Sequence, residues 1–281
     1  MEKLQVAIEQ AREKRKNKGR VPPAPRDGSG SQRGRAGPRL LPDSLMERWS
    51  ALTEISLPER TNDERRLVSH LPGPEASHYD ILRTKLLIEV RKNGWRRIAI
   101  TSPTGGCGKT TTASNIAVGI GRQGDLRASL FDLDLRRPAV GRVFGHTPER
   151  DIADFLHGGV TYEQQAVRVG SNLAISMAFR PQVDPTQLLA SSRTAELFDE
   201  IEREYAPDVM IFDLPPLLVG DDARAFLQNV DCAILMAQAG STTAAEIDIC
   251  EREIAEQTNV MGVVLNRCRY TEQRQGYEYY G

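Results

Sequence analysis

The sequence predicts an α/β fold, with a mostly parallel sheet, helices on both of its faces, and a flexible N-terminal arm before it. Continuous apolar runs alternate with helical patterns after residue 75, which is typical of a buried parallel sheet. A glycine-rich turn joins an apolar run to a helical pattern at residues 98–120, as in phosphate-binding folds. With 281 residues, 40% of them hydrophobic, the chain can build a sizeable core.

Each expected element has its own pattern. Apolar residues recur at helical intervals over 79–90 and again over 113–120, on either side of the first core strand. The strands are expected at 98–101, 127–131, 173–177, 209–212, 232–236 and 260–265. Further helices are expected at 192–204, 220–228 and 243–257. In such sheets ligands bind at the carboxyl ends of the strands, here residues 102–110, 132–138, 213–220 and 266.

Composition divides the chain into four parts. Residues 1–18 predict a basic amphipathic helix, and 19–74 a flexible linker that is partly ordered at best. Residues 75–266 form the expected folded domain, which contains the glycine-rich turn, and 267–281 a flexible tail rich in tyrosine. The N-terminal helix suits a membrane surface or a partner's groove, and equally a solvated, frayed helix.

Charge and cysteine usage exclude several classes of protein. Residues 1–39 carry eleven Lys/Arg against four Asp/Glu, but the net charge of the whole chain is −1, which does not favour nucleic acid as a partner. The four cysteines are far apart and predict neither a zinc site nor disulfides. No run of about eighteen apolar residues occurs, so we expect a cytoplasmic protein.

The glycine-rich turn has the composition of a phosphate loop. Its backbone N–H groups and the helix N-terminus would bind the phosphates of ATP, with Lys109 on the β- and γ-phosphates and Thr110 on Mg²⁺. The expected nucleotide-binding residues here are Gly105, Gly106, Cys107, Gly108, Lys109, Thr110 and Thr111. Pro103 stands where the usual spacing has its first glycine, so the motif is a variant. The alternative is a plain strand-to-helix turn with a chance lysine.

Carboxylates follow two of the expected strands. Asp132 and Asp134 follow the strand at 127–131, and Asp213 follows the strand at 209–212. Phosphoryl transfer needs carboxylates that hold a metal ion and orient the attacking hydroxyl. A single aspartate at a strand end is more often a cap or a turn residue, but three behind one phosphate loop favour chemistry. Arg136 and Arg137, which follow them, suit either a phosphate or a neighbouring carboxylate.

These motifs resemble the bacterial tyrosine kinases of capsule and exopolysaccharide systems, a family of P-loop ATPases. The resemblance covers residues 77–281 and rests on the phosphate loop, Asp132-x-Asp134-x-Arg136 and Asp213-x-Pro-Pro216. It implies that Thr110, Asp132 and Asp213 hold Mg²⁺, that Lys109, Asp132 and Asp134 are catalytic, and that Asn266 contacts adenine. Either Asp132 or Asp134 would be the base.

The resemblance also implies an acceptor for the phosphoryl group. Members of the family phosphorylate a C-terminal tyrosine cluster between subunits, and this chain has Tyr270, Tyr277, Tyr279 and Tyr280 among polar residues near its end. We therefore expect an exposed acceptor tail, although an ordered tail that packs against a neighbour is the alternative. A homo-oligomer would follow from phosphorylation in trans.

Two departures from the family concern its partners. The helix that joins subunits usually reads Glu-x-x-Arg-x-x-Arg, but here Ser77 and Asp80 replace its first two charges and only Arg83 remains. No membrane-spanning activator is fused, which resembles members that a separate membrane-bound polysaccharide co-polymerase activates and recruits to the inner face of the membrane. The helix at 1–18 could help that docking, and deletion of residues 1–20 would test this.

Two other functions remain open. Partitioning and septum-placement ATPases share the fold and use ATP as a switch without a phosphate acceptor. Their phosphate loop has an extra lysine where this chain has Thr104, which favours the kinase. The other reading is a regulatory nucleotide-binding scaffold without turnover.

Overall fold

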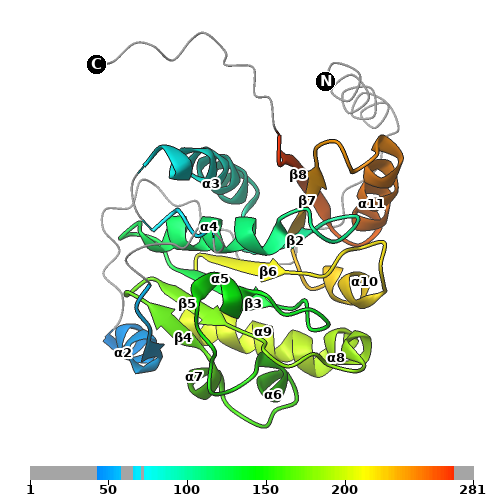
Figure 1. Cartoon of the computed structure of the whole chain (residues 1–281). Helices are drawn as coiled ribbons and strands as arrows, with labels where there is room; N and C mark the ends of the chain where they lie inside the picture. The colour runs from blue at the N-terminus through cyan, green and yellow to red at the C-terminus, as the bar shows by residue number, and fades with distance from the viewer. Residues whose placement is uncertain (1–42, 58–65, 71–72, 269–281) are drawn as a thin grey trace, which may run out of the picture.

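The computed structural model describes residues 43–57, 66–70 and 73–268, and they form a layered α/β structure (Figure 1). The strands are β1 (Thr53–Glu54), β2 (Arg97–Thr101), β3 (Ala128–Asp132), β4 (Val167–Val169), β5 (Leu173–Ser176), β6 (Val209–Asp213), β7 (Cys232–Gln238) and β8 (Asn259–Asn266). Within the described ranges they make one sheet in the order β1-β4-β5-β3-β6-β2-β7-β8. Only β4 and β5 pair antiparallel, so the predicted mostly parallel sheet is confirmed.

Helices cover both faces of this sheet, as predicted (Figure 1). They are α2 (Asp43–Ala51), α3 (Pro74–Asn93), α4 (Lys109–Gly121), α5 (Val140–Phe144), α6 (Ile152–Leu156), α7 (Tyr162–Gln165), α8 (Pro185–Ala190), α9 (Ser192–Tyr205), α10 (Asp222–Leu227) and α11 (Ala244–Gln257). None of the helices in the described ranges is both long enough and apolar enough to span a bilayer.

The core consists of two apolar clusters, one on each face of the sheet. On one face α3, α4 and α5 share one apolar cluster with the strands, and α3 also packs on α4. On the other face the buried rings of Phe131, Phe198, Phe212 and Phe226 join β3 and β6 to α9 and α10, with centroids about 5 Å apart. Both faces are therefore sealed, which explains why the strands are continuous apolar runs.

The segment before residue 75 contributes structure to the same sheet. Strand β1 extends the sheet beside β4, and the indole of Trp49 in α2 is buried, with its Nε1 donating to the carbonyl of Tyr205 at 2.8 Å.

Farther along, Leu67 is buried and the amide oxygen of Asn115 accepts hydrogen bonds from Val68 and Ser69, both 2.9 Å long. Parts of the expected linker thus pack on the domain, N-terminal to the expected boundary. The expected helix at 1–18 and the tail tyrosines lie outside the described residues.

Strand order brings the predicted motifs to one edge of the sheet. β2, which leads into the phosphate loop, lies between β6 and β7, and β3 lies beyond β6. Asp132 and Asp213 are direct partners in the register of β3 and β6. The carboxyl ends of these parallel strands therefore meet beside the loop.

Candidate functional site

The phosphate loop turns sharply at two glycines before α4 begins. Gly106 and Gly108 have φ of 84° and 88°, a left-handed conformation in which side chains with a Cβ are strained. Gly108 caps α4, so the first N–H groups of that helix face the loop. A Cβ on Gly108 would lie 2.3 Å from the Asn266 amide nitrogen, so a side chain there would also have to displace Asn266.

Lys109 and Thr110 begin α4, and their side chains reach the two carboxylate motifs. The Nζ of Lys109 lies 3.8 Å from Oδ2 of Asp134, and both side chains are largely buried. The Thr110 hydroxyl donates to Oδ2 of Asp213 at 2.5 Å. The loop, Asp134 and Asp213 thus come together as the sequence predicts.

The carboxylate of Asp132 is hydrogen-bonded to the segment that follows β3. Its Oδ2 accepts hydrogen bonds from the backbone N–H groups of Ala139 and Val140, at 3.1 and 3.0 Å. Its Oδ1 is buried without a hydrogen-bond partner among the described residues, and so is Oδ1 of Asp213. An unpaired buried oxygen is costly, and among the carboxylate oxygens of the described residues only these two are buried without a partner.

The electrostatics of the three carboxyl groups follow from burial. Burial raises the pKa of Asp132 well above its ordinary value, and the charge of Asp213 raises it further. Burial also raises the pKa of Asp213 to about 7, although Lys109 and the Thr110 hydroxyl oppose the shift. The pKa of Asp134 is raised by burial and held down in part by Lys109. A cation at this edge would favour the ionised forms.

The residues fit a magnesium ion that is bound together with phosphates. Mg²⁺ takes hard oxygen ligands and commonly uses one or two carboxylates, with water and phosphate oxygens completing its shell. The two orphaned carboxylate oxygens and the Thr110 hydroxyl are such ligands. Across the described ranges no group of three or more His, Cys, Asp or Glu is placed so that it could hold a metal ion.

The ends of β7 and β8 form the other wall of the loop. The Asn266 side chain donates to the carbonyl of Cys107 at 2.9 Å, so it supports the loop backbone. Gln238 lies at the end of β7, close to Gly106 of the loop. Its Oε1 would be 3.7 Å from a Cβ placed on Gly106. Sequence analysis missed Gln238, although its place at the end of a strand beside β2 was the available signal.

The arginines after Asp134 have different surroundings. Arg136 binds Asp222 with both Nε and Nη2, at 2.5 and 3.0 Å, so its partner is a neighbouring carboxylate. The backbone N–H of Arg137 donates to the carbonyl and to Oδ1 of Asp134, and its side chain is exposed. Asp222 is a second residue that sequence analysis missed, since no local pattern links it to Arg136.

The remaining residue of the subunit-joining motif is engaged within the chain. The Arg83 guanidinium donates to Asp80 at 2.6 Å and to the carbonyl of Gly119 in α4 at 3.2 Å. Arg83 thus ties α3 to the helix of the phosphate loop.

Comparison with known proteins agrees with this geometry. The ParA family model, described as NUBPL iron-transfer P-loop NTPase, matches residues 95–280. Tyrosine-protein kinase YwqD of Bacillus subtilis is 28% identical over 209 residues, which are 73% of this chain and 86% of YwqD. Tyrosine-protein kinase etk of Escherichia coli K12 is 29% identical over 188 residues, 66% of this chain but only 25% of etk.

A solved structure extends the likeness to the fold. The VpsO kinase domain superposes with a TM-score of 0.62 and 28% identity, and the match covers 69% of this chain and 94% of that domain. This chain matches most of the VpsO kinase domain and most of YwqD. It matches only about a quarter of etk. The chain therefore belongs to the ParA family of P-loop NTPases, in the group formed by the bacterial tyrosine kinases.

Proposed function

We propose that this chain is a protein-tyrosine kinase that uses Mg·ATP to phosphorylate tyrosines in the 270–280 segment of a neighbouring copy. The observation that carries the proposal is the pair Asp132 and Asp213, each with one buried oxygen unpaired among the described residues, directly behind the phosphate loop. The kinase names of the relatives support the same reaction class.

Each residue has a role in the proposed reaction. The N–H groups of the loop and of the first turn of α4 bind the phosphates, and Lys109 neutralises charge that develops on the transferred group. Thr110, Asp132 and Asp213 would hold Mg²⁺, and the ion would supply positive charge that offsets the charge of the phosphates. Asn266 fixes the loop and lies at the edge where adenine is expected.

Proton transfer is assigned to the carboxylates after β3. Asp134 is the more accessible of the two candidates, since its side chain is 11% exposed, whereas Asp132 is fully buried and its Oδ2 accepts from two backbone N–H groups. We therefore favour Asp134 as the group that orients and deprotonates the incoming tyrosine hydroxyl. The raised pKa of Asp134 suits a base that works near neutral pH.

The wider role is regulation of exopolysaccharide or capsule production. We propose that a membrane-bound polysaccharide co-polymerase activates the chain and recruits it to the inner face of the cell membrane. Each phosphate on the tail adds about −1.5 to −2 charges, so successive phosphorylation would weaken an oligomer by repulsion. Sedimentation of phosphorylated protein beside a variant with all four tail tyrosines changed to phenylalanine tests this, and equal sedimentation would contradict it.

Intact-mass spectrometry tests the kinase activity itself. Incubation with Mg·ATP, with and without the cytoplasmic part of a co-encoded membrane partner, should add one to four phosphates that map to Tyr270, Tyr277, Tyr279 and Tyr280. Lys109→Met should lower phosphorylation at least about 100-fold, because charge stabilisation in a P-loop site is worth this much. Lys85→Met, an exposed lysine on α3, is the matched control. ATP consumption without phosphotyrosine under both conditions would instead favour a ParA-type switch.

A further inference from the structure

We propose that Asp222 is a positioning residue for the reaction: by clamping Arg136, it holds the segment after β3 so that Asp134 stays against Lys109. Asp222 itself contacts neither the phosphate loop nor Asp132, Asp134 or Asp213 through any hydrogen bond or ion pair that the described residues show. The inference rests on the proposed role of Asp134.

The contacts of Asp222 use both of its carboxylate oxygens. Oδ2 accepts from Nε of Arg136, and Oδ1 accepts from Nη2 of Arg136 and from the Thr186 hydroxyl. The Asp222 side chain is only 3% exposed, whereas that of Arg136 is 48% exposed. One buried carboxylate thus joins the segment after β3 to the first turns of α8 and α10. We call this group, Arg136, Thr186 and Asp222, the clamp.

A bidentate pair of this kind fixes geometry as well as supplying energy. Two parallel N–H···O bonds set both the distance and the plane of the guanidinium. Because Asp222 is buried, its attraction to the half-exposed Arg136 is screened by water less than that of a pair in which both side chains are exposed. The pair at Asp221 and Arg224, one residue away along the chain, is such an exposed pair, since the Asp221 side chain is 76% exposed.

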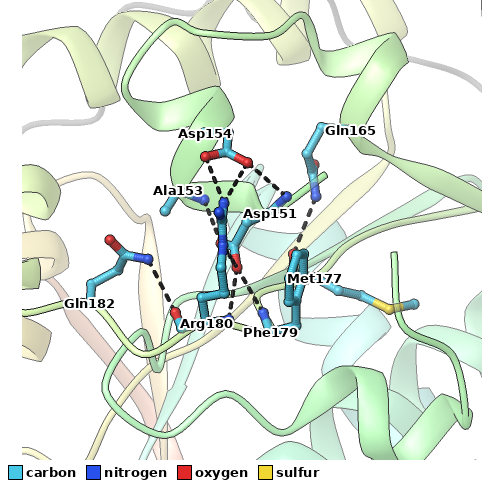
Figure 2. A network of polar contacts seen from close by, with 8 residues as sticks. All are labelled: Asp151, Ala153, Asp154, Gln165, Met177, Phe179, Arg180 and Gln182. Carbon is cyan, nitrogen blue, oxygen red and sulfur yellow. Dashed lines mark hydrogen bonds and ion pairs between the residues drawn. The ribbon is translucent and has the colours of Figure 1, made fainter. Parts of the chain in front are cut away.

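A second anchor holds the residue before Arg136. The carbonyl of Leu135 accepts a hydrogen bond from the backbone N–H of Gln182 at 2.9 Å. Figure 2 shows how the segment that contains Gln182 is fixed: the buried carboxylate of Asp151 accepts from the N–H groups of Phe179 and Arg180, both at 2.9 Å. Arg180 in turn binds Asp154 with Nη2 at 2.6 and 2.7 Å.

Asp134 therefore lies between two fixed points. On one side Asp132 ends β3, and on the other Leu135 and Arg136 are bound to residues outside the nucleotide site. Loss of the clamp would leave β3 and the phosphate loop intact but free the backbone on one side of Asp134. A shift of about 1 Å in a reacting group can cost up to about 100-fold in rate.

The clamp could instead be only a tie between α8 and α10, since Thr186 and Asp222 also bind each other directly. The two roles predict different results. A tie that is only structural lowers thermal stability and leaves turnover per folded molecule unchanged. A positioning role lowers kcat while the affinity for Mg·ATP is kept.

The test compares Asp222→Asn with Asp221→Asn in the full chain. Asp222→Asn keeps the shape of the side chain but removes the charge that holds Arg136. We expect kcat for ADP release to fall about 10- to 100-fold, with less than about a threefold change in the Kd for Mg·ATP. Asp221→Asn removes the exposed pair on the same helix and should change neither value. Thr186→Val removes the hydroxyl but keeps the pair between Arg136 and Asp222. This variant should have a lower Tm and a nearly unchanged kcat.

A double variant that restores the ion pair gives a second test. A purely structural role of the clamp predicts no recovery of kcat in that variant. In Arg136→Lys combined with Asp222→Glu, the longer carboxylate side chain reaches the lysine ammonium and restores one ion contact. The double variant should therefore recover part of the kcat that Arg136→Lys alone loses. Equal kcat in Asp222→Asn and Asp221→Asn, or a loss of kcat that follows loss of folded protein, would overturn the proposal.

Hydrogen exchange separates this proposal from the proposed function. The amides of Arg137, Ala139 and Val140 should exchange at least about tenfold faster in Asp222→Asn than in Asp221→Asn, with no turnover needed. If Asp134→Asn retains full activity, the role proposed for Asp134 fails whatever the exchange shows. If exchange of these amides is unchanged in Asp222→Asn, the clamp fails whatever the protein phosphorylates.

Discussion

At the scale of single residues, the two oxygens Oδ1 of Asp132 and Oδ1 of Asp213 distinguish this sheet edge from an ordinary turn. Both are buried, and neither has a partner among the described residues. Their neighbours Oδ2 are bound to backbone N–H groups and to Thr110, so each side chain is already oriented. The edge is therefore organised for a cation at a cost in stability.

That cost predicts a pH dependence of stability that Asp213→Asn should reduce, with the raised pKa of Asp132 accounting for the remainder. The folded pKa of Asp213 is raised to about 7, so between about pH 4 and pH 7 the folded protein keeps a proton that the unfolded chain has released. Stability from this group is thus lost as pH rises through that window. Asp213→Asn should melt several degrees higher than the native protein at pH 8, and the gain should shrink toward pH 4.5.

Thermal melts at intervals of half a pH unit without magnesium provide the measurement. Asp231→Asn is the control, because that carboxylate lies at the opposite end of the strands, where it accepts from the N–H groups of Arg96 and Arg97. A gain in Tm for Asp213→Asn that stays constant from pH 5 to pH 8 would contradict the raised pKa.

Sequence patterns predicted the local part of the site and missed the rest. Lys109, Thr110 and the aspartates stand in short motifs at strand ends, so their meeting follows from the parallel sheet. The partner of Arg136 is 86 residues away along the chain. No periodicity records such a contact, which depends on how α8 and α10 pack. The use of Arg136 was therefore open until the structure was known.

At the scale of elements, the predicted strands were those with continuous apolar runs. All six are present: burial leaves a clear apolar pattern in the inner strands, and β8, half-buried at the edge of the sheet, is still a continuous apolar run. Strands β1 and β4 were missed, since they have two and three residues and β4 contains Arg168. Helices α2, α5, α6, α7 and α8 were also missed. Of these, α6 and α7 each begin with a capping box, at Asp151 and at Thr161.

The turn from β2 into α4 yields a prediction about glycine. Gly108 and Gly94 both have positive φ, at 88° and 70°, but a Cβ meets nothing within 4 Å at Gly94. Gly94→Ala should cost about 1 kcal/mol and leave nucleotide binding intact. Gly108→Ala carries the same strain and also displaces Asn266, so it should abolish measurable binding of Mg·ATP.

Titration calorimetry with a non-hydrolysable ATP analogue checks both variants. Adding Asn266→Gly to Gly108→Ala removes the side chain that clashes and should restore part of the binding. Equal affinity in Gly108→Ala and Gly94→Ala would show that contact with Asn266 has no effect.

At the scale of the whole molecule, α2 joins the domain through Trp49, its largest buried side chain, together with the buried Leu45 and an ion pair between Arg48 and Glu204. Trp49 is 2% exposed, and the guanidinium of Arg127 lies 4.9 Å from the centroid of its ring. Trp49→Ala should cost about 3–5 kcal/mol of stability, which lowers Tm by roughly 10 °C in a domain of this size. Met46→Ala, on the same helix but 53% exposed, should lower Tm by no more than about 2 °C.

Calorimetric melts of the full chain would decide whether residues 43–57 are an integral part of the domain. A single transition that moves as a whole in Trp49→Ala supports this. An unchanged main transition would show that α2 contributes nothing to the stability of the rest.

The position of α4 has a consequence for how this sequence can vary. The helix lies between the sheet on one side and α3 with residues 66–70 on the other, and nearly every side chain from Thr112 to Ile120 is buried. A Cβ on Gly119 would lie 3.3 Å from Arg83, and one on Gly121 would lie 2.8 Å from Leu173. On a surface helix, residues of the exposed polar face can be substituted at little cost, but α4 has no exposed polar face. Among the helices in the described ranges, α4 should therefore accept the fewest substitutions when every position is varied.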